Sequence, residues 1–102
     1  MVHVTLFSRD GALCGFRMKG HAGGTAGHDI VCAAISSAAL LAANTITEVC
    51  GCRAVTRQRD GYLLLSIAEG DRGGDILEGL YLHLQALRRQ YPRKLALVVI
   101  EI

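Results

Sequence analysis

The segment that decides the fold runs from Gly20 to Ser36 and reads GHAGGTAGHDIVCAAIS. A glycine-rich stretch is followed by an apolar, alanine-rich one, so we expect a loop that leads into a buried helix. Asp29 is a suitable N-cap, because its side chain can accept hydrogen bonds from the free amides of the first turn. The helix is then expected over residues 30–49, buried on most sides and ended by Gly51.

Strand patterns flank this segment on both sides. Alternating residues predict strands over 1–8, 12–19, 52–59 and 62–68, joined in pairs by Asp-Gly turns at 10–11 and 60–61. A second, amphipathic helix is expected over 76–91, and the apolar segment 95–102 is expected as a strand inside the sheet, not at its edge. The order ββαββαβ predicts one α/β domain over residues 1–102, a sandwich of one mixed sheet packed with two helices.

The two predicted helix starts resemble each other. Residues 27–31 read GHDIV and residues 73–77 read GGDIL. In the second helix the third residue after the Asp is Glu78, which suits a capping box headed by Asp75. In the first helix that position holds Cys32, which caps nothing well. Such departures from a local rule are expected at functional sites.

Composition narrows the class of protein. The chain has 102 residues, 51% of them hydrophobic and 20% charged, which is typical of a folded globular domain. The net charge is only +2 and no block of like charges is present, so no direct nucleic-acid partner is expected. The longest apolar stretch, residues 30–43, is interpreted as too short to span a bilayer, and the N-terminus is no signal peptide. We therefore expect a cytoplasmic protein without a membrane partner, and reduced cysteines.

Cys32 is the candidate nucleophile. As the third helical residue it lies beside unpaired N–H groups and the positive end of the helix dipole, which favour the reactive thiolate. His21 precedes it by eleven residues, enough loop to bring an imidazole back to the sulfur as a base. His28 is an alternative base, and Ser36, one turn after Cys32, is either a site residue or a helix-bonded hydroxyl. The structural alternative is that Cys32 only fills an alanine-rich helix face.

Other chemistries have weaker support. His21, His28, Asp29 and Cys32 include ligand types for zinc, but they lack a recognised zinc spacing. The glycine loop lacks the Lys-Ser/Thr pair of a phosphate-binding loop. Cys14 is interpreted as a strand residue of the core, and the Cys50-Gly51-Cys52 turn as packing with a C-cap glycine. No metal and no cofactor are therefore predicted.

These motifs do resemble those of a known family. GHAG at residues 20–23, followed by Gly27 and then DIVCAAIS at 29–36, resembles the ribosomal-processing cysteine protease Prp family, also labelled YsxB-like. The resemblance covers the whole chain in length and element order. It implies an endopeptidase with His21 as base and Cys32 as nucleophile, and a loop that includes Gly20, Gly23 and Gly27 and closes on a peptide. Here residues 24–26 are small, where an aromatic residue and a longer loop are expected.

The resemblance also implies a substrate and an assembly. The implied substrate is the N-terminal extension of large-subunit ribosomal protein twenty-seven, and the implied assembly is a homodimer. The apolar first helix independently favours a dimer that covers part of that helix or a sheet edge. The alternative from another class is a non-catalytic ribosome-associated module that binds a protein arm. A thiol-dependent transferase or a redox-sensing thiol is the remaining catalytic alternative.

Overall fold

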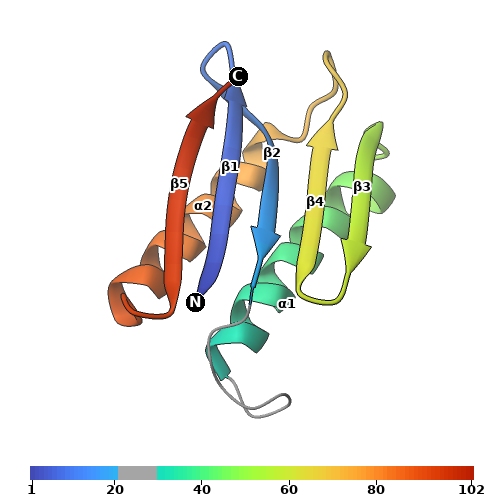
Figure 1. Cartoon of the computed structure of the whole chain (residues 1–102). Coiled ribbons are helices and arrows are strands. Elements are labelled where there is room, and N and C mark those ends of the chain that lie inside the picture. The colour runs from blue at the N-terminus through green and yellow to red at the C-terminus, as the bar shows by residue number, and fades with distance from the viewer. Residues whose placement is uncertain (21–29) are drawn as a thin grey trace.

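The structure, a computed structural model, describes residues 1–20 and 30–102. Figure 1 shows one five-stranded mixed sheet with two helices on one of its faces. The strand order is β3-β4-β2-β1-β5, and only the β1–β5 pair is parallel. The predicted element order and the α/β fold class are confirmed. The elements are β1 (Val2–Arg9), β2 (Ala12–Lys19), α1 (Ile30–Asn44), η1 (Thr45–Val49), β3 (Ala54–Arg59), β4 (Tyr62–Ile67), α2 (Gly74–Gln90) and β5 (Leu95–Glu101).

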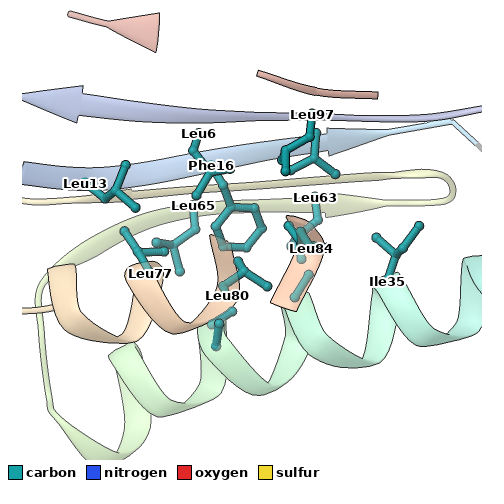
Figure 2. Close-up of a cluster of buried hydrophobic side chains, with 14 of the residues drawn as sticks. Leu6, Leu13, Phe16, Ile35, Leu63, Leu65, Leu77, Leu80, Leu84 and Leu97 are labelled. Atoms are coloured by element: carbon teal, nitrogen blue, oxygen red, sulfur yellow. The ribbon is translucent and has the colours of Figure 1, made fainter. Parts of the chain in front are cut away.

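The core lies between the sheet and the helix layer. Alternate side chains of the central strands turn towards the helices, because successive residues of a strand point to opposite faces. Figure 2 shows the ring of Phe16 between the sheet and the two helices. Leu84 of α2 lies beside the ring on the helix side, Ile35 of α1 lies further along the same layer, and all three side chains are fully buried. The predicted apolar stripe of the second helix is confirmed by buried Leu77, Leu80 and Leu84, with Leu87 and Tyr91 packed against the core.

The first helix has the predicted length but not the predicted burial. Helical structure runs from Ile30 to Val49, and its last turn, η1, is π-helical. Gly51 follows with a φ of 65°, as expected for a glycine that ends a helix. The expectation that the helix is buried on most sides is wrong, since Leu41 is 69% exposed. The reason is geometric: with one sheet below and one helix beside it, a helix in a two-layer fold keeps an outer face.

The same segment also bears on the prediction that the apolar stretch is too short to span a bilayer. Ile30–Val49 is long and apolar enough, by length and composition alone, to cross a membrane, so the stretch is not too short. In the structure the helix instead lies on the sheet, where Val31, Ile35 and Ile46 are buried. The core helix of a soluble protein meets the same criteria, so this finding is weak evidence for a membrane span.

The position of the last strand also differs from the prediction. β5 lies at an edge of the sheet and pairs only with β1, so the prediction of an interior strand is wrong. Its first half is covered, with Leu95 and Leu97 buried, whereas Val98 and Ile100 are 52% and 45% exposed. A continuous apolar run indicates that a strand is covered, but not that another strand lies on each side of it.

The start of α2 differs from the prediction as well. The N-cap is Gly73, two residues before Asp75, and it has no side chain with which to cap the helix. A β-carbon at Gly73 would meet the Cδ1 end of the Ile67 side chain on β4, so a larger capping residue would require that side chain to move. Asp75 lies inside the first helical turn, where its carboxylate faces the positive end of the dipole.

Candidate active site

Cys32 lies where the sequence predicts it, as the third residue of α1. Its side chain is half-buried and packs against the hydrophobic core. Amides of the first helical turn have no partner within the helix, so the thiol lies beside a cluster of N–H donors. Such donors are suited to hold the oxyanion that forms when a sulfur nucleophile attacks a carbonyl.

The thiol opens into a cavity with a volume of about 460 Å³. One wall is α1, the second is the end of β2, and the third is the β3–β4 hairpin (Figure 1). Its apolar residues come from all three walls, which would hold the side chains of an extended peptide beside the sulfur. The lining residues are Met18, Gly20, Cys32, Ser36, Leu40, Gln58, Arg59, Asp60, Gly61, Tyr62 and Leu63.

Gly20 fixes the end of β2 at this cavity. Its φ of 97° lies in the left-handed region, and a β-carbon there would lie 2.7 Å from the backbone oxygen of Met1. Both the dihedral angle and the close approach therefore require glycine. The Gly20 amide donates a hydrogen bond to the Gly61 oxygen at 2.9 Å, which ties the start of the glycine loop to the tip of the hairpin.

The sequence-predicted site residues fall into two groups. Gly20, Cys32 and Ser36 lie in the described part of the chain and line the same cavity, while their roles stay predictions. The other predicted positions lie outside the described residues, and their roles stay predictions. They are His21, Gly23, Gly27 and Asp29, together with the rival base His28.

The hairpin wall was not predicted from the sequence. Lys19 pairs with Tyr62 across β2 and β4, which brings residues 58–63 beside the start of α1. Asp60 and Gly61 are recognisable as a turn, but nothing local says which strand the hairpin joins. The guanidinium of Arg59 lies 4.3 Å from the centroid of the Tyr62 ring at this wall.

The other three cysteines lie at different depths: Cys14 and Cys52 are half-buried and Cys50 is exposed. The four cysteines form no disulfide with one another. The Cys52 thiol donates a hydrogen bond to the Arg72 oxygen at 3.3 Å, and Cys14 is half-buried on β2 rather than a full member of the core. Within residues 1–20 and 30–102, no three His, Cys, Asp or Glu side chains are grouped closely enough to hold a metal ion.

Solved structures share this architecture. A structure of the ribosomal processing protease Prp from S. aureus, with a covalently linked product peptide, matches at a TM-score of 0.88 and 28% identity. The match covers 97% of this chain and 99% of that one. A second S. aureus Prp structure, with a substrate peptide, matches at 0.84 and 27% identity over 97% and 99% of the two chains.

A third structure shows the fold alone. SMU.848 from Streptococcus mutans matches at a TM-score of 0.82 and 24% identity, over 100% of this chain and 96% of that one. The comparison with curated proteins gave no match.

The family assignment rests on the sequence as a whole. The model of the family described as cysteine protease Prp matches residues 1–96. This match covers the glycine loop, Cys32 and every wall of the cavity, and it confirms the resemblance drawn from the GHAG and DIVCAAIS motifs. The chain therefore belongs to the Prp family and is a cysteine protease.

Proposed function

We propose that this protease removes the N-terminal extension of large-subunit ribosomal protein twenty-seven, with Cys32 as nucleophile and His21 as base. The observation that carries the proposal is the position of Cys32, at a helix start and open to a cavity with three walls. The S. aureus relatives are described as a ribosomal processing protease, one with a substrate peptide and one with a covalently linked product peptide. A covalent link to a peptide is what a nucleophilic mechanism would leave.

The proposed chemistry is an acyl transfer in two stages. His21 takes the proton of Cys32, and the sulfur attacks the carbonyl carbon of the scissile bond. Backbone N–H groups at the start of α1, or in the glycine loop with Gly23 and Gly27, hold the oxyanion. The carbon–nitrogen bond breaks as His21 protonates the leaving amine. Water then hydrolyses the thioester, which releases the carboxylate product and restores the thiol.

Two further residues have proposed roles beside the dyad. Asp29 lies outside the described residues; its proposed role is to cap the helix and keep the first amides oriented, and its carboxylate would also hold an imidazole. Ser36 lines the same cavity as Cys32, one helical turn away, where its hydroxyl would contact the peptide. Met18, Leu40 and Leu63 supply apolar walls, so we expect the cavity to accept apolar substrate side chains.

We further propose a cytoplasmic homodimer. Two described surfaces offer apolar area to a second copy of the chain. One is the groove of about 610 Å³ between α1 and α2, beside which Leu41 is exposed. The other is the β5 edge, with Val98 and Ile100 exposed. Large apolar areas of this kind are characteristic of interfaces.

The test uses the N-terminally extended ribosomal protein of the same organism as substrate, with cleavage products weighed by mass spectrometry. We expect a single cut that removes the extension. The His21→Ala variant should lose a factor of about 100 or more in rate, which is the usual contribution of a positioned general base. The His28→Ala variant should lose far less, mainly through weaker substrate binding.

The outcomes separate substrate from mechanism. An intact extended protein, alongside cleavage of other unfolded polypeptides, would contradict the substrate. An inactive His28→Ala variant together with an active His21→Ala variant would contradict the dyad. The Cys14→Ser variant is the thiol control, because Cys14 is also half-buried but lies on β2 outside the Cys32 cavity, and it should cleave at the wild-type rate.

A further inference from the structure

In the part of the chain that the structure describes, one face of the sheet is not covered by helices. In Figure 1 it is the face towards the viewer, because α1 and α2 both lie behind the strands. The side chains of this open face are those that alternate with the core residues of each strand. On β2 and β3 they include Arg17, Lys19, Arg57 and Arg59. Each of these residues is a sequence neighbour of a strand residue that faces the helices, so its own side chain lies on the open face.

The strand register gathers these four cations into two rows. Arg17 pairs with Leu64, and Leu64 pairs with Arg57. The neighbouring row has the same composition, with Lys19 paired to Tyr62 and Tyr62 to Arg59. From standard strand geometry, the cations lie about 7 Å apart along a strand and about 10 Å apart across the intervening strand β4. We call these six residues the cationic face.

Aromatic rings lie among the cations. The Arg59 guanidinium carbon is 4.3 Å from the centroid of Tyr62, and that of Arg17 is 6.0 Å from the centroid of Phe7. These contacts confirm that cations and rings share one face. Tyr62 is half-buried, so part of its ring surface is open to a planar ligand. Arg57, Arg59 and Lys19 are exposed.

No carboxylate on the strands balances this charge. Glu101 is the only acidic residue in the five strands. Its carboxylate lies at the far end of the sheet and accepts hydrogen bonds from the Ser8 hydroxyl and the Asp10 amide. Asp60 lies beyond the strands, in the hairpin turn at the rim. The net charge of +2 is therefore unevenly spread, with a positive field concentrated on one face.

We propose that the cationic face binds single-stranded RNA. Each nucleotide offers a phosphate for a cation and a base for a ring, and this face alternates cations with exposed apolar and aromatic surface. An acidic peptide would supply the charge but no planar group for Tyr62. An anionic membrane would also supply the charge and would contact exposed Val55 beside Arg57, but its headgroups offer no planar ring for Tyr62.

The choice of RNA over DNA rests on the proposed function, since ribosome maturation would bring the enzyme to ribosomal RNA. Arg59 and Tyr62 also line the Cys32 cavity, so the RNA site and the peptide site meet at the hairpin tip. RNA held on the open face would retain the enzyme on an assembling particle while a protein arm enters the cavity. The RNA site itself does not depend on which peptide is cut.

The test measures binding of the full chain to a fluorescein-labelled, mixed-sequence RNA of about twelve nucleotides by anisotropy. Affinity should fall steeply from about 50 to about 200 mM salt. The Arg17→Gln/Arg57→Gln variant should bind more weakly, and its log–log salt slope should be shallower by about 1.4, since each lost contact removes about 0.7. The matched control is Arg88→Gln/Arg89→Gln, which removes the same charge from exposed positions on α2 and should keep the wild-type slope.

Four outcomes would overturn the proposal: no binding at the lowest salt, an equal loss in the α2 control, stronger binding to single-stranded DNA of the same sequence, or binding to phosphatidylserine vesicles without binding to RNA. Peptide cleavage is assayed separately in the same preparations. RNA binding with no cleavage of the ribosomal protein leaves this inference standing and contradicts the proposed substrate. Cleavage of the ribosomal protein without RNA binding contradicts this inference and leaves the proposed substrate standing.

Discussion

α1 and α2 cover the same face of the sheet, yet they are built differently. α2 buries leucines, has Asp75 in its first turn and Arg88 and Arg89 in its last, so its charges complement the helix dipole. α1 buries mainly alanines and β-branched residues, with no acidic residue in its first turn and no basic residue in its last. Local charge thus stabilises α2, whereas the described part of α1, Ile30–Asn44, has no such charges in its first or last turn. The helix without them is the one that carries the thiol.

The largest effect should come from the start of α1. Cys32→Ser should lower peptide cleavage by about a thousandfold or more, because a hydroxyl is a far weaker nucleophile than a thiolate. The melting temperature should change little, since the two side chains have similar volumes. Cleavage rate and thermal denaturation measure the two effects separately.

The control lies in the first turn of the other helix. Asp75→Asn at the start of α2 should lower the melting temperature slightly, through the lost dipole interaction, and leave cleavage unchanged. If Asp75→Asn lost activity at full stability, the division of roles between the two helix starts would be wrong.

The next largest effect should come from the buried face of α2. Leu84 is 1% exposed, and Leu84→Ala should lower the free energy of unfolding by about 2–5 kcal/mol, because it removes apolar contacts and leaves a cavity. Urea denaturation followed by circular dichroism measures this loss. At temperatures where the variant remains folded, cleavage per molecule should stay near that of the wild type. Leu82→Ala, on the exposed side of the same helix, should cost little and serves as the control.

A smaller effect should come from the outer face of α1. Leu41 is 69% exposed beside the α1–α2 groove. If the proposed dimer covers this groove, Leu41→Glu would place a charge in an apolar interface and weaken association about tenfold or more. Light scattering at several concentrations would then show a monomer where the wild type is a dimer.

Two variants locate the interface. Leu82→Glu adds the same charge at a similarly exposed leucine of α2 that does not line the groove, and it should leave the dimer intact. Val98→Lys tests the β5 edge instead. A dimer lost in Val98→Lys and retained in Leu41→Glu would place the second copy on the sheet edge and leave the α1 face open.

Much of this architecture is visible in the sequence because it is encoded by local periodicity. The alternation in residues 12–19 and the Asp-Gly turn at 10–11 give β2 and its hairpin, and Asp10 and Gly11 have the positive φ angles that such a turn requires. Position 32 at a helix start is equally local. Two short motifs were enough to suggest the family, and so the enzyme class, which the family model then confirms over residues 1–96.

What the sequence hides depends on pairing between distant segments. The place of β5 at the edge, the hairpin wall of the cavity and the cationic face all follow from strand order and register. Arg17 and Arg57 are far apart in the chain and alternate with apolar residues, so no charge run marks them. The cap at Gly73 was missed for a related reason, since the place where this turn packs on Ile67 of β4 is not visible in the local pattern.

The smallest effect concerns the link between the end of the first helical segment and the start of α2. The Asp71 carboxylate accepts hydrogen bonds from the Arg53 amide at 2.5 Å and the Arg53 Nε at 3.3 Å. The Arg53 side chain, through its hydrogen bonds, and then the Arg53 amide lower the pKa of Asp71 below its ordinary value of 3.8. The Arg53 side chain is 75% exposed and that of Asp71 is 22% exposed, so solvent screens the pair and keeps its contribution small.

A lowered pKa fixes the sign of the pH dependence. Asp71 binds protons less readily in the folded state than in the unfolded state, so its contribution is fully present above the ordinary value of 3.8 and is lost as the pH falls through the lowered pKa. Asp71→Asn should therefore lower the melting temperature slightly at about pH 7. The melting temperatures of the variant and the wild type should converge as the pH falls through the lowered pKa of Asp71. Glu69→Gln, in the same loop but without an Arg53 contact, is the control and should show no such convergence. A difference between Asp71→Asn and the wild type that persists unchanged at low pH would mean that the link acts through packing of the loop, so that the junction between the two helices is held by shape rather than by charge.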